Sequence, residues 1–171
     1  MLELFLLTAN QVPLVQMVRA EVFFSEEQAV HQIFPTLVMA AKTQELTEAQ
    51  FLELKKNTEL GISDRKIRYF VSPTGEMVFI DRVMGKHEII TYAVGIDRNG
   101  AVHQIEIMEY KEKYGGEIRR SDWKRQFNGK TRAAKLKLSE DIQNVSGATL
   151  SCKHVTDGVK RVLKTYELIQ R

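Results

Sequence analysis

Four segments in the middle of the chain alternate between apolar and polar side chains, and they lie at residues 66–71, 76–83, 89–96 and 101–109. A period of two places every second side chain on the same face, as in a strand that is buried on one side. Between the segments stand residues suited to tight bends, at 72–75, at Gly85 and at 97–100. Short connections of this kind join antiparallel neighbours, so the pattern predicts a four-stranded antiparallel meander as the core sheet.

Two helices are predicted ahead of this sheet, because residues 25–28 and 47–50 both fit the capping-box pattern. In this pattern a Ser or Thr hydroxyl and a Gln side chain on the following turn each bond a free backbone N–H. The first helix should run to about Phe34, where Pro35 stops it, and the second should fade over 57–61.

The C-terminal part of the chain predicts two further helices. A short one spans 121–127, with Ser121 as its candidate N-cap, and an amphipathic one spans 155–166. Helical spacing puts the apolar side chains of the second on one face and leaves three cations on its outer side, Lys160, Arg161 and Lys164. The predicted fold class is therefore α+β, a single domain in which N-terminal helices and a C-terminal helix flank the meander.

Residues 1–20 are rich in apolar side chains but make a poor membrane span. The stretch is interrupted by polar residues, and its apolar part is shorter than a bilayer requires. As a secretory signal it offers a short apolar segment at 4–7 and a small-residue site at 18–20, but it has an acidic Glu3 and no positive start. We therefore divide the chain into an apolar leader or signal remnant at 1–20 and one domain at 21–171, and we leave export open.

Charge is distributed unevenly along the chain. Residues 1–90 carry 9 Lys and Arg against 12 Asp and Glu, whereas residues 91–171 carry 16 against 10, for a net charge of +3. The most basic stretch, 111–137, fits a nucleic-acid groove, an anionic cofactor or lipid surface, or a solvated face. Few aromatic side chains interleave with it and no nucleic-acid-binding motif is present, so we favour the solvated face and expect no nucleic-acid partner.

The residue types leave several chemistries without support. The single cysteine, Cys152, cannot form a disulfide within the chain or supply a four-cysteine iron–sulfur site. The histidines have no metal-site spacing, and neither a P-loop nor a GxGxxG dinucleotide motif occurs. His87, in a predicted turn, is interpreted as a solvated loop residue rather than a general base. As nucleophiles, Ser146 lacks a GxSxG elbow, and Cys152 is better explained as a small residue packed under the helix.

Residues 145–151 are mostly small or hydroxylated and stand immediately before the C-terminal helix. A helix N-terminus offers free N–H groups and a positive partial charge, and small side chains let an anion approach the backbone. The same residues also suit a plain N-cap. The stretch therefore indicates either a phosphate site or a helix cap.

The stretch 146–151 resembles the hallmark of the FMN-binding domain, which occurs in flavin subunits of the sodium-pumping NADH:quinone oxidoreductase and its ferredoxin-linked relatives. Two upstream blocks, at 109–116 and 123–130, are similar to the family's glutamate and glycine loop and to its tryptophan, Gln-Phe and Gly-Lys block. The similarity covers about 85–162. Residues 21–34 also look like the mature start of small exported members.

This resemblance implies FMN as the cofactor and gives a role to each matching residue. In the family the last threonine of the SGAT motif esterifies the flavin phosphate, which makes Thr149 the attachment point, with a flavin transferase as partner if the bond is covalent. The loop around the phosphate would be shaped by Ser146, Gly147, Ala148, Leu150 and Ser151. The ring or the ribityl chain would be approached by Glu112, Gly115 and Gly116.

An isoalloxazine ring also needs a largely apolar slot, for which the candidates are Tyr114, Trp123, Phe127 and Leu150. Helical spacing makes Trp123 and Phe127 better explained as core residues. The family's transferase pattern has an aspartate six residues before the acceptor threonine, where this chain has Gln143, with Asp141 two residues further upstream. FMN binding is therefore the firmer expectation, and covalent attachment stays open.

The function expected from the resemblance is that of an FMN-binding electron carrier or redox subunit rather than a stand-alone enzyme. It implies a membrane redox partner or electron-transfer complex, and a place on the extracytoplasmic (periplasmic) side or at the membrane. Two alternatives stay open. One is a flavin-free interaction or regulatory module in which the SGAT loop only caps the helix, and the other is an enzyme that uses Cys152 or Ser146 as its nucleophile.

Overall fold

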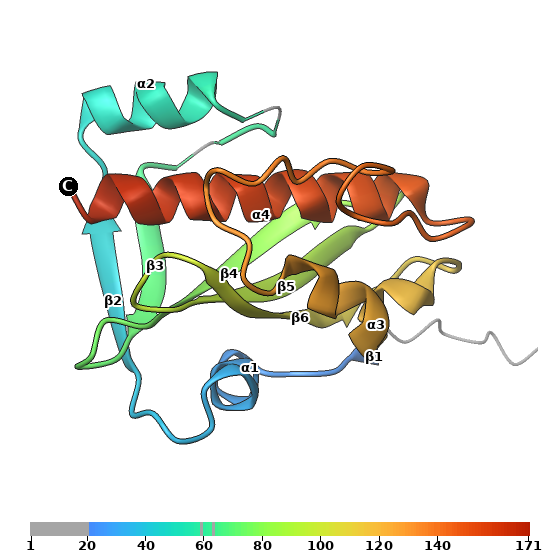
Figure 1. The fold of residues 1–171 in the computed structure, drawn as a ribbon, viewed down its shortest axis with the longest axis horizontal. Helices are drawn as coiled ribbons and strands as arrows, with labels where there is room; N and C mark the ends of the chain where they lie inside the picture. The colour runs from blue at the N-terminus through green and yellow to red at the C-terminus, as the bar shows by residue number, and fades with distance from the viewer. Residues whose placement is uncertain (1–20, 59, 63) are drawn as a thin grey trace, which may run out of the picture.

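The computed structural model describes residues 21–58, 60–62 and 64–171, so the leader predicted at 1–20 lies outside the described residues. At its centre is an antiparallel sheet of six strands in the order β1-β6-β5-β4-β3-β2 (Figure 1). The strands are β1 (Glu21–Val22), β2 (Ala40–Glu45), β3 (Lys66–Val71), β4 (Met77–Met84), β5 (Ile89–Ile96) and β6 (Val102–Tyr110). The helices are α1 (Glu26–Ile33), α2 (Glu48–Lys56), α3 (Ser121–Lys124) and α4 (Thr149–Ile169), with 3₁₀ turns η1 (Gly116–Arg119) and η2 (Arg125–Phe127).

The four strands β3 to β6 form the meander that the sequence predicts, and each pairs with the next in antiparallel register. β3 and β5 have the predicted bounds, whereas β4 and β6 are shifted by one residue toward the C-terminus. The sequence prediction missed both edge strands. The side chains of β2 are almost all exposed, so no apolar alternation marks it, and β1 has only two residues.

Helices cover both faces of the sheet (Figure 1). α1 packs on one face, where Ile33 and Ala93 belong to the same buried cluster. α4 packs on the other face over Tyr92, and α2 lies against the C-terminal part of α4 through Leu54 and Leu168. Because the neighbours Tyr92 and Ala93 point to opposite faces of β5, one central strand supplies core side chains to both layers.

Both predicted capping boxes are confirmed. Ser25 Oγ accepts from Gln28 N at 3.2 Å, and Ser25 N donates to Gln28 Oε1 at 2.8 Å. Thr47 and Gln50 make the same pair of bonds at 3.2 and 2.9 Å. The helices that these boxes start, α1 and α2, end where the sequence predicts, before the proline and before the 57–61 stretch.

Two helix starts differ from the prediction. Ser121 does not cap α3, because Arg120 takes the N-cap position without a side-chain bond and Ser121 is the first helical residue. α4 begins at Thr149, ahead of the amphipathic run that predicts it, because Cys152 N donates to Ala148 O at 2.9 Å and closes the first turn. The small hydroxylated stretch therefore includes the first turn of α4 as well as the loop before it.

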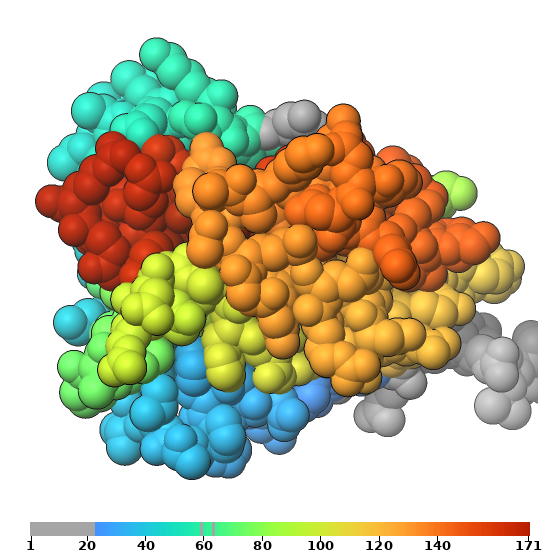
Figure 2. Space-filling view, viewed as in Figure 1, coloured from blue at the N-terminus to red at the C-terminus, as the bar shows by residue number. Residues whose placement is uncertain are grey.

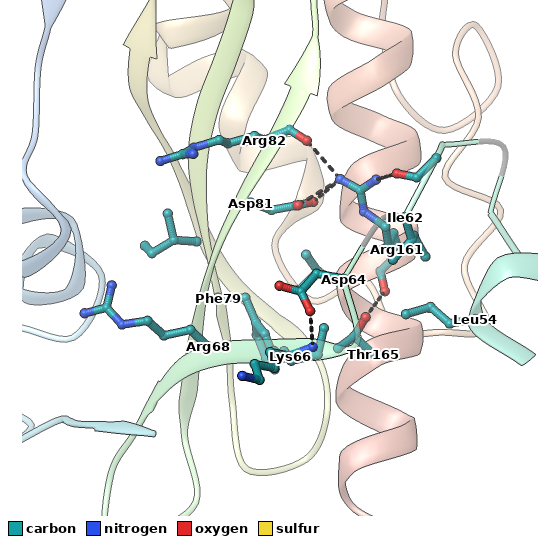
Figure 3. A pocket seen from close by; sticks show the side chains of 14 residues that line it. Leu54, Ile62, Asp64, Lys66, Arg68, Phe79, Asp81, Arg82, Arg161 and Thr165 are labelled. Atoms are coloured by element: carbon teal, nitrogen blue, oxygen red, sulfur yellow. Dashed lines mark hydrogen bonds and ion pairs between the residues drawn. The ribbon is translucent and has the colours of Figure 1, made fainter. Parts of the chain in front are cut away.

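The expectation that three cations lie on the outer side of α4 is wrong for two of them. Arg161 turns inward, where its Nη2 donates to both carboxylate oxygens of Asp81, at 2.8 and 2.7 Å, and to the Arg82 carbonyl at 3.0 Å (Figure 3). Lys164 is 6% exposed and pairs with Glu53 at 2.6 Å. Carboxylates on β4 and α2 supply the partners without which burial of these cations would be costly.

A hollow of about 280 Å³ lies beside the Arg161 ion pair, between α4, β3, β4 and the connection from α2 to β3 (Figure 3). Asp64 on its wall accepts a hydrogen bond from Lys66 N at 2.9 Å. Figure 3 shows the side chains of Arg68 and Arg82 extending away from Arg161. The charged side chains that line this hollow do not converge on one point, and we assign the hollow to the packing of the fold.

Most cations of the basic stretch 111–137 form ion pairs with carboxylates of this chain. The pairs are Lys111 with Glu109, Arg120 with Asp122, Lys124 with Glu106, Lys130 with Asp141, Arg132 with Glu167, and Lys135 and Lys137 with Glu140. Figure 2 shows the connection from α3 to α4, in orange, lying across α4. Among the described residues, no helix has the length and apolar character that a bilayer span requires.

Candidate functional site

A hollow of about 570 Å³ opens at the N-terminal end of α4. Three segments from distant parts of the sequence line it, which are the β4–β5 turn at 86–88, the residues after β6 at 111–114, and the start of α4 with its preceding loop at 147–151. This volume lies in the range of roughly 300–1,000 Å³ that is typical of small-molecule sites. The fold therefore brings most of the predicted phosphate loop together with Glu112 around one cavity.

The start of α4 presents polar groups to this hollow. Ala148 N donates to Val145 O at 3.0 Å, and Ala148 takes the N-cap position without offering a side-chain acceptor. The N–H groups of the first helical turn are therefore left for a ligand. Thr149 is exposed, and its Oγ1 accepts from Asn144 Nδ2 at 2.8 Å. Asn144 thus orients the Thr149 hydroxyl and leaves its proton free.

A tyrosine hydroxyl lies where the last strand, the loop after it and α4 meet. Tyr110, at the end of β6, donates its hydroxyl to the Tyr114 carbonyl at 2.6 Å and lies 3.4 Å from Ser151 Oγ. Burial raises the pKa of Tyr110, so the hydroxyl stays protonated and can donate. Ser151 is 3% exposed. It lies in the first turn of α4, and it is also one of the residues that line the hollow.

The predicted glycine loop lies against the loop before α4. Gly115 has a φ of +82°, and a Cβ at this position would stand 2.3 Å from the Ala148 Cβ, so a side chain does not fit. Gly116 follows and begins η1. Both glycines line a neighbouring hollow, also of about 570 Å³, which shares Glu112 and Tyr114 with the first.

The Glu112 carboxylate is bonded to the β4–β5 turn. Its Oε1 accepts from His87 N at 2.6 Å and from Glu88 N at 3.0 Å. Partial burial opposes ionisation, but these donors together with the backbone N–H of Lys86 lower the pKa of Glu112 below its ordinary value. Glu112 is therefore a charged group whose oxygen is already engaged by protein N–H groups.

The four candidates for an apolar ring slot divide into two pairs. Tyr114 and Leu150 line the hollow and are 70% and 45% exposed. Trp123 and Phe127 are buried and pack edge to face, with ring centroids 5.1 Å apart, which confirms their interpretation as core residues. Trp123 Nε1 donates to Gln143 O at 2.9 Å, so the structure places Trp123 under the α3–α4 connection and outside the lining of the hollow.

The two candidate nucleophiles differ in accessibility. Cys152 is fully buried, and burial raises the pKa of its thiol, so the reactive thiolate is disfavoured. This agrees with its interpretation as a packed small residue. Ser146 is exposed but does not line the hollow.

Lys111 and Lys113 come from the basic stretch that the sequence offers for an anionic cofactor, whereas sequence reasoning missed three other polar residues that the fold brings to the site, namely Lys86, His87 and Asn144. The first two follow the turn-forming Gly85, and from the sequence His87 is interpreted as a solvated loop residue. Only the pairing of β4 with β5 and the packing of α4 place them opposite residues 147–151. No spacing in the linear sequence carries that information.

In this α+β fold an antiparallel sheet supports a candidate phosphate loop at the start of a helix. Residues 85–164 match the family model of the FMN-binding domain. Over this part of its length the chain is similar to the FMN-binding domain family, and this match indicates FMN as its cofactor. Comparison with curated proteins gave no match.

The donor set at the hollow fits FMN. The free N–H groups of the first turn of α4 and the Thr149 hydroxyl suit a phosphate, and Lys86, Lys111 and Lys113 supply positive charge along the opposite wall. Tyr114 and Leu150 offer apolar surface for a flat ring. The matched range contains all of these residues.

Proposed function

We propose that this chain is an electron-transfer flavoprotein that holds FMN in the hollow at the start of α4. The observation that carries the proposal is the convergence of segments 86–88, 111–114 and 147–151 on one cavity inside the matched domain. In this arrangement the flavin phosphate lies at Thr149, within the first helical turn. The ring extends toward Tyr114 and Leu150.

The bound flavin supplies the redox chemistry, because its ring accepts and releases electrons. The chain's own residues bind and orient it. The loop residues 147–148 and the N–H groups of Thr149, Leu150 and Ser151 hold the phosphate, and the lysines of the opposite wall balance its charge. A catalytic acid or base of the chain is not required for this role.

Thr149 is also the residue that we propose for covalent attachment. The ester forms when Thr149 Oγ1 attacks the flavin phosphorus of a flavin dinucleotide held by a flavin transferase. An oxygen–phosphorus bond forms, the diphosphate bond breaks, the adenylate half leaves with the electron pair of that bond, and the hydroxyl proton is released. The exposed side chain and its bond to Asn144 support this role, since the oxygen is both accessible and oriented.

Expression with and without a flavin transferase tests these proposals. We expect a yellow protein in both cases, and with the transferase an intact mass increased by the esterified flavin. Thr149→Val should lose the mass increase, whereas Ser146→Ala should keep it. Flavin that remains fully extractable by acid after transferase treatment would overturn the ester but not the binding. A colourless protein after addition of FMN would overturn the flavin site and favour the helix-cap alternative.

We further propose that the mouth of the flavin pocket meets a redox partner at the membrane, on its extracytoplasmic side. Exposed apolar side chains gather there, since Met84 and Ile89 pair across the hairpin next to residues 86–88, while Tyr114 and Leu150 line the hollow. A patch of exposed apolar side chains rimmed by polar residues is typical of an interaction site.

A vesicle assay tests the membrane part of this proposal. We expect the flavin-loaded protein to sediment with vesicles of phosphatidylglycerol and phosphatidylethanolamine, and Ile89→Ser or Leu150→Ser to weaken that binding. Leu52→Ser is the matched control, because Leu52 is similarly exposed on α2, away from the pocket. Equal binding by all variants would contradict the assigned surface.

A further inference from the structure

We propose that Glu112 is a positioning residue of the site, and that its carboxylate holds the β4–β5 turn so that Lys86 and His87 form the second wall of the FMN pocket. The identity of the ligand rests on the function proposed above. The positioning role rests on the contacts of the turn itself.

The turn is built around the Glu112 side chain. Gly85 N donates to Glu88 O at 2.7 Å, which closes the turn on itself. Inside it, Glu112 Oε1 accepts from His87 N at 2.6 Å and from Glu88 N at 3.0 Å. Successive backbone N–H groups that converge on one anion form a typical nest. Here a protein carboxylate occupies the nest, so Glu112 connects the turn to the segment after β6.

The residue before the nest leaves room for this carboxylate. A Cβ on Gly85 would lie 2.5 Å from Glu112 Oε1, 3.0 Å from Glu88 O and 3.2 Å from Ile90 Cδ1. A side chain at this position would therefore displace the carboxylate. Gly85 and Glu112 thus form one structural unit.

Lys86 is the group that this unit presents. It is exposed and lines the hollow opposite 147–151. Among the residues that the structure describes, no carboxylate pairs with its ammonium group, whereas neighbouring Lys111 is paired with Glu109 at 3.0 Å. An unpaired cation facing a phosphate loop is suited to bind the phosphate or to lie along the flavin. Glu112 does not compete for it, because backbone N–H groups already engage its charge.

The test measures the protection of the turn in the cofactor-free protein and the affinity of the site for FMN. In the FMN-free protein, amide hydrogen exchange of His87 and Glu88 reports on the turn, and titration with FMN reports on the site. Glu112→Ala should remove protection at both amides and lower FMN affinity by about tenfold. Glu112→Gln keeps an acceptor oxygen, so it should retain most of the amide protection and most of the FMN affinity. Lys86→Gln should lower FMN affinity while leaving the amides protected.

Two further variants serve as controls. Gly85→Ala keeps Glu112 but should displace its carboxylate, so it should reproduce the effect of Glu112→Ala even if the latter folds poorly. Glu117→Ala changes a nearby exposed carboxylate and should leave both readouts unchanged.

Amides that stay protected in both Glu112→Ala and Gly85→Ala would overturn the positioning role. Loss of affinity in Glu112→Gln with intact protection would also overturn it, because the charge would then act directly on the flavin. Absence of FMN binding by the unaltered protein would overturn the proposed function, while hydrogen exchange would still decide whether Glu112 holds the turn.

Discussion

Gly115 lies directly against Ala148, at a distance where a Cβ on Gly115 would stand 2.3 Å from the Ala148 Cβ and 2.9 Å from the Tyr110 hydroxyl oxygen. This contact joins the loop after β6 to the loop before α4. Two of the three sequence blocks that carry the family resemblance, 109–116 and 146–151, therefore touch in space. Their relative position depends on the absence of a side chain at one residue.

Gly115→Ala should therefore weaken both the fold and the site. The left-handed φ of +82° costs an alanine about 1–2 kcal/mol, and the clash with Ala148 adds about 1–3 kcal/mol. Gly129→Ala is the matched control, because Gly129 has a φ of +76° but nothing within 4 Å of an added Cβ. Urea unfolding and FMN titration should show a larger stability loss for Gly115→Ala, and a loss of FMN affinity only there. Equal effects of the two substitutions would contradict the contact.

Gln143→Asp should increase covalent flavin attachment. It restores the aspartate that the family's transferase pattern has at this position, and Gln143 is exposed on the loop ahead of Thr149. The measurement is the fraction of protein with bound flavin after denaturation, compared at equal transferase concentrations. Gln143→Asn is the control for side-chain size and should leave that fraction unchanged. No difference between the two variants would show that the departure at Gln143 does not limit attachment.

Arg161→Met should destabilise the fold by about 3 kcal/mol. The substitution leaves the Asp81 carboxylate with the Tyr92 hydroxyl at 2.6 Å and without its cation. Lys160→Met is the control, because Lys160 is only partly buried on the same helix and lies 3.7 Å from Asp157. Chemical denaturation of both variants gives the comparison. A loss no larger than that of the Lys160 variant would show that the buried pair contributes little.

Asp141 should make stability depend on pH in the acidic range. Burial opposes its ionisation, but the N–H groups of Lys137 and Leu136 and the Lys130 ammonium group lower its pKa below the ordinary value of 3.8. A carboxyl group whose pKa is lower in the folded state contributes stability that is complete above its unfolded pKa and is lost as the pH falls through the folded one. The stability advantage over Asp141→Asn should therefore be full at about pH 7 and should shrink below about pH 4. An advantage that stays constant down to about pH 2 would contradict this assignment.

The sequence predicts the meander and both capped helices because each of these depends on neighbours in the chain. Alternation along β3 to β6 and the bonds of Ser25 and Thr47 act over a few residues. β2 has no such local signal, since its polar side chains are exposed and its strand state comes from pairing with β3. Arg161 and Lys164 looked solvent-facing because their partners, Asp81 and Glu53, come from other elements.

The candidate site likewise contains residues that local motifs predict and residues that only the fold brings together. The phosphate loop and the glycine loop are visible as contiguous motifs, and the structure brings both to the start of α4. Trp123 matches a motif but lies in the core, because its indole N–H bonds the Gln143 carbonyl. Lys86 and His87 belong to no motif, and only the β4–β5 register delivers them. Residues whose role depends on tertiary pairing are those that sequence reasoning misses.

The length of α4 gives the molecule two functionally unequal ends. Its 21 residues extend over roughly 30 Å, with the proposed flavin pocket at the first turn and Leu168 packed against α2 near the last. Gln50 on α2 also bonds the Leu168 carbonyl at 2.7 Å, which closes the far end. A partner bound there would be separated from the flavin by the whole helix. In the proposed electron-transfer role, electrons would therefore enter and leave near the hairpin end, away from the α2 end.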